Sequence, residues 1–247
     1  MTSETPHKES FYHATIISNI QKWFIIIGSL LSLFAIFTPD NKKKCIDITI
    51  CLISIICFIL EFAFSYFYQK AGEEKVKDLV DNGLNSKLSD YRSKDYYTND
   101  EIKNGLPKLG VNSFESVFFT KSIVRKMIER NTIPFVIIFL IYICSIFFFE
   151  KEIWIKIFQF LLPLQIMKEF IYLLYFYSKI KDIYDDYKKV YGTTKKKERV
   201  PYIIKNIILY EKLLSTYQIL TDSKIYRKLN NELSQDWIEV KREYCIE

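Results

Sequence analysis

The stretch from Ile46 to Phe67 reads IDITICLISIICFILEFAFSYF and decides how the rest of the chain can fold. It is as long as the roughly 20 residues that a helix needs to cross the hydrocarbon core of a bilayer. Its only charged residues are Asp47 and Glu61. Because such a helix is apolar on every side, water is a poor solvent for it. Ile46 to Phe67 is therefore predicted to cross a membrane.

Three further apolar blocks accompany this stretch. Phe24–Phe37 precedes it, and Ile133–Phe149 and Ile153–Tyr177 follow after a long polar segment. Turn signals at Pro39-Asp40-Asn41 and Glu150-Lys151-Glu152 separate the blocks within each pair and favour two hairpins. The sequence thus predicts an all-α, polytopic membrane protein with two transmembrane helical hairpins, a cytosolic helical insert and a cytosolic helical C-terminal tail.

Basic residues predict the orientation of this arrangement. The expected segments are an N-terminal tail (1–22), a first transmembrane hairpin (23–68), a cytosolic insert (69–131), a second transmembrane hairpin (132–178) and a cytosolic helical tail (179–247). The N-terminal tail, the insert and the C-terminal tail carry 2, 12 and 15 lysines and arginines, and the two hairpin turns carry 3 and 1. Since basic segments stay on the cytoplasmic side, both termini and the insert are expected in the cytoplasm. The three lysines of the first turn oppose this orientation.

The totals exclude several classes of protein. The five cysteines follow no ligand spacing and only two histidines are present, so neither a metal site nor a cofactor is expected. The net charge of +6 is modest and suits an anionic membrane surface, and we predict no nucleic-acid partner. No phosphate-binding glycine loop or nucleophile motif occurs, and the chain is not expected to be an enzyme.

Local signals predict helices in the two cytosolic segments. Tyr66–Leu84 continues the second membrane helix, and two capping boxes, Thr98 with Glu101 and Asn112 with Glu115, predict a short helix and then a longer one. In the tail, two helices separated by Thr221 or Asp222 are expected to bury apolar stripes. These stripes are Ile204, Ile208, Leu213, Tyr217 and Leu220, and Tyr226, Leu229, Leu233, Trp237, Val240 and Tyr244.

Polar residues at membrane depth are the first candidate site. A charge in hydrocarbon costs on the order of 3 kcal/mol even on insertion scales, so such a residue faces a partner or water. Glu61 and Lys168 are candidates for an ion pair that holds two helices together. The alternative is a hydrated path lined by Glu61, Gln159, Gln165, Lys168 and Glu169.

Three smaller features complete the candidate residues. Gly28, Ser32 and Ala35 share one face of the first helix and would let another helix approach closely, as ordinary hairpin packing also does. Two basic groups could contact a lipid or a nucleotide phosphate, although a solvated loop explains the second group more simply. These groups are Arg92, Lys94, Tyr96 and Tyr97, and Lys195, Lys196 and Lys197.

The chain has the order hairpin, insert, hairpin and helical tail. Its insert contains two motif-like runs, Tyr96-Tyr97-Thr98-Asn99-Asp100-Glu101-Ile102 and Asn112-Ser113-Phe114-Glu115-Ser116-Val117-Phe118-Phe119-Thr120. In this order and these runs the chain resembles the SMODS-associating four-transmembrane effectors of bacterial anti-phage defence. The resemblance implies a pore-forming, homo-oligomeric effector that permeabilises the inner membrane during abortive infection. It also implies a nucleotide second messenger, or a sensor linked to a nucleotidyltransferase, as the source of the signal.

Two other functions remain open at this stage. The chain could be a membrane anchor that recruits a soluble partner through the helices between Pro201 and Tyr244. An intramembrane enzyme or transporter subunit is a weaker alternative, because the halves show no repeated broken helices.

Overall fold

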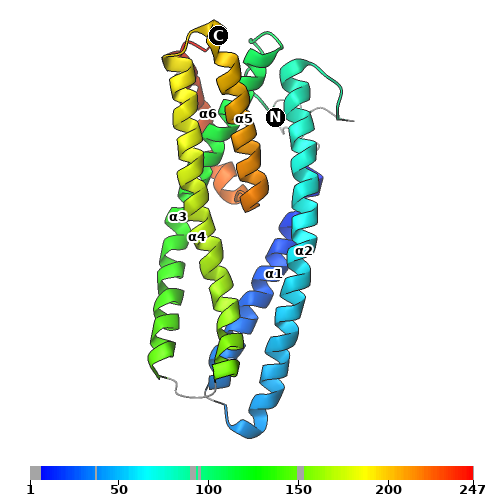
Figure 1. The fold of residues 1–247 in the computed structure, drawn as a ribbon, viewed down its shortest axis with the longest axis vertical. Coiled ribbons are helices and arrows are strands. Elements are labelled where there is room, and N and C mark those ends of the chain that lie inside the picture. The colour runs from blue at the N-terminus through cyan, green and yellow to red at the C-terminus, as the bar shows by residue number, and fades with distance from the viewer. Residues whose placement is uncertain (1–6, 37, 90–92, 94–95, 149–152, 247) are drawn as a thin grey trace. The chain divides into compact units, whose positions relative to one another are not determined.

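The computed structural model describes the backbone of residues 7–36, 38–89, 93, 96–148 and 153–246. Within these ranges the side chains of 7–10, 33, 36, 40, 41, 142, 145–148 and 153–166 lie outside the description. The described residues form helices and no strand (Figure 1), which confirms the predicted all-α class. The elements are α1 (His7–Ile36), α2 (Asp40–Leu84), α3 (Leu106–Phe148), α4 (Ile153–Gly192), the short 3-10 helix η1 (Lys196–Glu198), α5 (Arg199–Tyr217) and α6 (Ser223–Glu243).

The chain forms two compact units. Unit 1 contains residues up to Phe11, then Tyr68–Glu129 and Leu173–Glu247, and unit 2 contains Tyr12–Phe67 and Arg130–Tyr172. Helices α2, α3 and α4 each contribute one part to either unit without a break. The predicted continuation of the second apolar block as a helix to Leu84 is therefore confirmed.

In unit 2, the residues through which α1 and α2 pack against each other recur at alternating intervals of three and four residues. This spacing is typical of two helices with knobs-into-holes packing. The face of α1 is built mainly of small residues, whereas that of α2 is larger and often branched, so the two surfaces complement each other. The residues of the two faces are Ala14, Ser18, Gln21, Ile25, Gly28, Ser32 and Ala35, and Ile46, Ile50, Ile53, Cys57, Leu60 and Phe64.

The remaining faces of α1 and α2 present large apolar side chains to the outside. Trp23 is 66% exposed, and Phe58 and Phe62 are 65% and 64% exposed. Only 17% of the apolar stretch of α2 is buried. Among the described residues, α1 over Phe11–Ser32 and α2 over Lys42–Leu84 are long and apolar enough to cross a membrane. The start of α1 differs from the expectation, since a helix begins at His7 where a polar tail was predicted.

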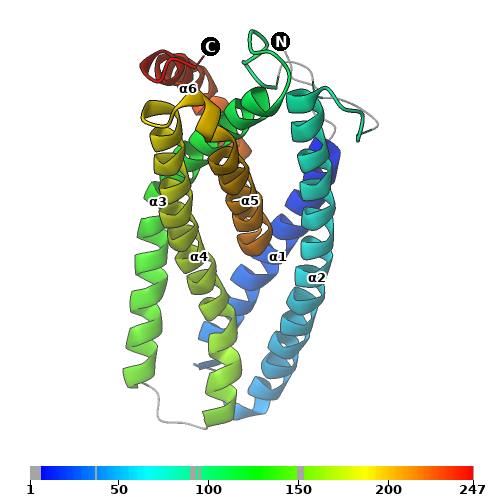
Figure 2. The same cartoon turned by 45° about the horizontal axis from the view of Figure 1, so that its top comes forward.

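Unit 1 is built around a large cluster of buried apolar and aromatic side chains. Its core contains a central phenylalanine, Phe114 of α3, against which Tyr187 and Tyr191 of α4 stack at centroid distances of 5.0 and 5.5 Å. Trp237 of α6 meets the same ring edge-on at 5.2 Å and is fully buried. Figures 1 and 2 show α5 and α6 lying against α3 and α4 on different sides.

The two predicted capping boxes do not form. Residues 96–105 are turns and bends, and α3 begins at Leu106, so Asn112 and Glu115 lie inside a helix. The reason is that residues of the two predicted boxes form hydrogen bonds with one another, since Thr98 Oγ1 donates to Glu115 Oε1 at 2.9 Å. The side chain of a capping residue can form a hydrogen bond either with the nearby backbone or with a distant group, and here the distant hydrogen bonds form.

The predicted tail helices form, and the stripe predicted for α5 is partly confirmed, because Leu213 is buried and Tyr217 packs against the core. On α5 the buried residues are Ile203, Asn206, Tyr210 and Leu213, whereas Ile204 and Ile208 are exposed. On α6 the prediction is confirmed except at Tyr226, which is 37% exposed, since Leu233 and Trp237 are buried and Leu229, Val240 and Tyr244 pack against the core. Asp222 caps α6, because its carboxylate accepts from the N–H groups of Lys224 and Ile225.

Two glycines allow helices of unit 1 to approach closely. A Cβ atom on Gly83 of α2 would lie 2.7 Å from the Cα of Leu109 in α3. A Cβ atom on Gly110 of α3 would lie 2.7 Å from Ile203 Cγ2 of α5 and 2.9 Å from Tyr191 Oη of α4. A side chain at Gly83 would therefore require a helix to move, whereas one at Gly110 would require the side chains of Ile203 and Tyr191 to shift.

We predict that Gly110→Ala destabilises the protein by about 1–3 kcal/mol, because the added methyl group overpacks the contact with α5. The measurement is the thermal unfolding midpoint in detergent. Gly72→Ala on α2 is the matched control, since nothing lies within 4 Å of its Cβ position and alanine favours a helix more than glycine does. Equal midpoints for the two variants would show that the close approach is not a constraint.

Candidate functional site

The first candidate site is a polar contact on the packed face of α1 and α2 in unit 2. Gln21, which is 5% exposed, donates from Nε2 to Glu61 Oε2 at 2.8 Å and to the carbonyl oxygen of Cys57 at 3.3 Å. Each polar group thereby compensates the desolvation of the other. Glu61 is thus hydrogen-bonded across the first hairpin, and no ion pair joins it to Lys168 in the part of the chain that the structure describes.

Further charged groups of unit 2 lie near this contact. Glu169 of α4 is within electrostatic reach of Lys22, Glu61 and Lys168. Lys168 itself lies over the ring of Tyr172, with Nζ 5.2 Å from the centroid. We call Gln21, Lys22, Glu61, Lys168 and Glu169 the polar cluster of unit 2.

The other predicted residues of unit 2 are placed as follows. The side chains of Gln159 and Gln165 lie outside the described residues. Gly28, Ser32 and Ala35 are buried on the face of α1 that packs against α2, and Ala35 belongs to one apolar cluster with Ile50 and Ile53. Ser32 donates its hydroxyl to the carbonyl oxygen of Gly28 at 2.8 Å, which satisfies this polar group within its own helix.

The second candidate site is a buried network in unit 1, where the segment 96–102 crosses α3. Asn99 is fully buried and donates from Nδ2 to Asn112 Oδ1 at 2.9 Å and to Glu115 Oε2 at 2.7 Å. On its other side, Asn99 Oδ1 accepts from Trp237 Nε1 of α6 at 3.3 Å. Lys241 of α6 donates to the carbonyl oxygen of Thr98 at 2.9 Å. This network therefore joins the segment, α3 and α6.

Glu115 is the titratable group at the centre of this network. Burial raises the pKa of its carboxyl to about 7, while hydrogen bonds from Thr98 and Asn99 and the charge of Lys241 act to lower it. Tyr96 and Tyr226 are also within electrostatic reach of this carboxyl. The site holds a buried acid that changes charge near neutral pH.

Two more buried carboxylates fix the chain that leaves α2. Asp81 accepts from the hydroxyls of Ser86 and Ser89 at 2.6 Å each, and from the N–H groups of Leu88 and Ser89 at 2.8 Å each. Burial would raise the pKa of Asp81, but these hydrogen bonds hold it well below its usual range. Asp78 accepts from the N–H and hydroxyl of Ser93 at 2.8 and 2.7 Å.

The predicted ligand contacts fall into separate regions of the sequence. Arg92 and Lys94 lie outside the described residues. Tyr96 and Tyr97 pack edge-on with centroids 4.8 Å apart, and Tyr97 is 7% exposed, so little of its ring can stack on a ligand. Lys195, Lys196 and Lys197 precede α5, where Arg199 donates to the carbonyl oxygens of Tyr191 and Thr194.

Sequence reasoning missed Gln21 and the pairing of Asn99 with Glu115. Gln21 has a signal, because it continues the three- and four-residue steps of Ile25, Gly28 and Ser32 toward the N-terminus. The pairing of Asn99 with Glu115 has no sequence signal, since the residues around both positions also fit the pattern of local capping boxes.

The described residues contain no group of three or more His, Cys, Asp or Glu side chains that would hold a metal ion. Comparison with protein families, curated proteins and solved structures finds no match for this chain. The function is therefore inferred from the sequence and from the geometry of the two sites.

We predict that the thermal stability falls as the pH rises from 5 to 8, through ionisation of Glu115. The folded pKa of about 7 exceeds the ordinary value of 4.5, so the contribution is fully present below the ordinary value and is lost as the pH rises through 7. Complete titration is worth about 3 kcal/mol. Unfolding midpoints in detergent at several pH values measure this loss.

Glu115→Gln should flatten this pH dependence, because the amide cannot ionise. Glu232→Gln on the exposed side of α6 is the matched control and should keep the wild-type profile. A Glu115→Gln variant whose midpoint falls as steeply as that of the wild type would show that another group is responsible.

Proposed function

We propose that the chain is a multi-pass protein of a bacterial inner membrane that oligomerises and permeabilises this membrane in response to a cytosolic signal. The observation that carries the proposal is the combination found in unit 2, where large apolar side chains are exposed along the helices and the polar cluster occurs within the same apolar stretches, with Gln21 buried and its charged members exposed. Such residues, if they lie at membrane depth, belong beside a partner or a hydrated path.

The outward apolar faces support insertion into lipid. Exposed side chains such as Trp23, Phe58 and Phe62 would aggregate in water, whereas lipid tails solvate them well. The apolar parts of α3 and α4 belong to the same unit, and Ile133 and Leu140 of α3 are 69% and 55% exposed. We therefore infer four membrane spans, in α1, α2, α3 and α4.

The polar cluster supports a leak path formed by several subunits. One four-helix unit has too few polar side chains to line a continuous aqueous channel by itself, so oligomerisation is part of the proposal. Activation requires a signal that binds the open and closed arrangements with different affinity. The resemblance to SMODS-associating four-transmembrane effectors supports a nucleotide second messenger as this signal, in anti-phage defence that ends in abortive infection.

We predict that induced expression in a bacterial host lowers the membrane potential, measured with a potential-sensitive dye. Glu61→Gln should shift the ion selectivity of the leak toward anions, since it removes a carboxylate from the proposed path. The ion selectivity is measured on the full chain reconstituted in liposomes with opposing potassium and chloride gradients.

Glu73→Gln is the matched control for this experiment, because Glu73 is exposed on the same helix within unit 1. A selectivity that Glu61→Gln leaves unchanged would identify the contact with Gln21 as structural support only. Host cells that stay polarised while their membrane fraction contains the chain would contradict permeabilisation itself.

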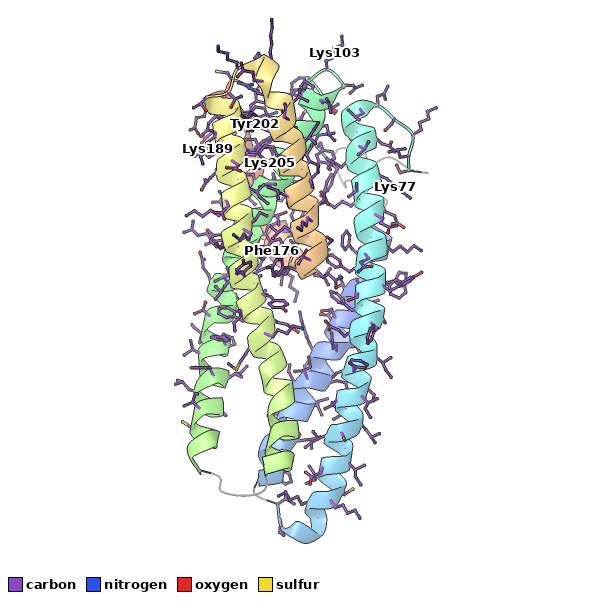
Figure 3. All side chains as sticks on the ribbon, in the orientation of Figure 1. Lys77, Lys103, Phe176, Lys189, Tyr202 and Lys205 are labelled. Carbon is purple, nitrogen blue, oxygen red and sulfur yellow. The ribbon has the colours of Figure 1, made fainter. Side chains whose placement is uncertain are left out.

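We also predict the side of the membrane on which each segment lies. In a variant whose native cysteines are serine, Lys103→Cys should resist an impermeant thiol reagent in spheroplasts and react in inverted vesicles. Lys42→Cys in the first turn should behave in the opposite way. Both lysines are exposed, and Lys103 is labelled in Figure 3. Labelling of Lys103→Cys from outside would reverse the proposed orientation.

The second candidate function is a membrane anchor that recruits a soluble partner through the C-terminal helices. The exposed face of α5 favours it, because Tyr202 and Ile208 are 50% and 60% exposed and Ile204 lies one turn from Ile208. Such a face on a cytosolic helix is typical of a protein contact. An anchor would leave the membrane potential intact and would lose its partner in an Ile204→Ser, Ile208→Ser variant.

A further inference from the structure

Lys121 of α3 has an unusual position in unit 1. Its ammonium group lies 3.3 Å from the centroid of the Tyr184 ring of α4 and 5.8 Å from that of Phe118. Lys188 approaches the same tyrosine ring at 5.8 Å and the ring of Tyr244 at 5.7 Å. Two helices thus bring two ammonium groups to one aromatic ring that is itself buried.

Positive charge exceeds negative charge around this ring. Arg125, Lys181 and Lys188 all lie within electrostatic reach of Lys121. The acidic groups within reach are Asp185 and, on the side of Lys188, Glu243. Arg125 has its own partner in Glu129, at 3.3 Å.

The three lysines of this group lack carboxylate partners. Within the described ranges, no ion pair joins Lys121, Lys181 or Lys188 to an acidic side chain, although neighbouring lysines such as Lys179 and Lys189 do have such pairs. A ring face attracts an ammonium group but leaves most of its three N–H donors available. Most donors of Lys121, Lys181 and Lys188 are therefore available to a ligand.

The charge state of Lys121 reflects this crowding. Burial lowers its pKa to about 8, and the neighbouring cations Lys188, Arg125 and Lys181 act in the same direction against Asp185. A half-buried ammonium group among other cations is unfavourable, and an anion placed between them removes the repulsion. Binding of an anion must therefore restore the positive charge of Lys121.

We propose that Lys121, Lys181 and Lys188 form a binding site for a phosphate-bearing anion beside Tyr184. A phosphate group offers several charged acceptor oxygens, which match the ammonium groups of Lys121 and Lys188 at one ring, with Lys181 within electrostatic reach, better than a single carboxylate does. The ligand is a soluble phosphate compound or the headgroup of an anionic lipid, which share this chemistry. The site stands independently of membrane permeabilisation.

The test follows the reactivity of Lys121 with an amine-acylating reagent at pH 8, measured by mass spectrometry on the full chain in nanodiscs of neutral phosphatidylcholine. Lys121 should react at least about tenfold faster than Lys189, because only the neutral amine reacts and an ordinary lysine is almost fully charged at this pH. Lys189, labelled on α4 in Figure 3, is the internal control, since it is 74% exposed.

Millimolar pyrophosphate should reduce the reactivity of Lys121 by about tenfold and leave Lys189 unchanged, which identifies a soluble ligand. Protection by phosphatidylglycerol nanodiscs alone identifies a lipid headgroup. A Lys181→Gln, Lys188→Gln variant should lose either protection, and its Lys121 should react more slowly because its pKa rises. Protection of Lys121 by neither anion, or a Lys121 that reacts at the rate of Lys189, would overturn the site.

Discussion

A single helix, α2, exposes large apolar side chains in its first part and buries apolar side chains in its second part. Up to Phe67 it turns large apolar groups such as Phe58 and Phe62 outward, whereas from Tyr68 onward it buries Ala71 and Leu79 and exposes Lys70 and Glu73. A helix alone can make this change without a break, because its backbone hydrogen bonds are internal in either surrounding. The architecture of the chain depends on this constraint, which α3 and α4 share.

The buried acids of unit 1 accept many hydrogen bonds from neutral donors. Asp78, Asp81 and Glu115 receive hydrogen bonds from hydroxyl groups, amides and backbone N–H groups of neighbouring segments. Neutral donors stabilise a buried carboxylate at a lower cost in desolvation than a buried ion pair does. Two lysines of unit 1, Lys75 and Lys108, are buried and pair with Glu211 and Asp100, while Lys121 and Lys188 lie around the ring of Tyr184.

The sequence predicts the helical class and the stripe of α6 because both follow from composition and spacing. It fails at Thr98 and Glu115, because each residue type suits a local cap as well as the distant contact that the structure contains. It also fails at Ile204 and Ile208, since the core takes Ile203 and the polar Asn206 instead. The apolar pattern indicates which faces of α5 could be buried. The face that is buried contains Ile203, which lies close to Gly110 of α3.

The backbone contact between Gly83 and Leu109 has a mechanical consequence. Because a Cβ atom at Gly83 would lie 2.7 Å from the Cα of Leu109, there is no layer of side chains between α2 and α3 to absorb a displacement. A turn of α2 about its own axis would push directly on the first turn of α3. A displacement of one helix is therefore transmitted directly to the other.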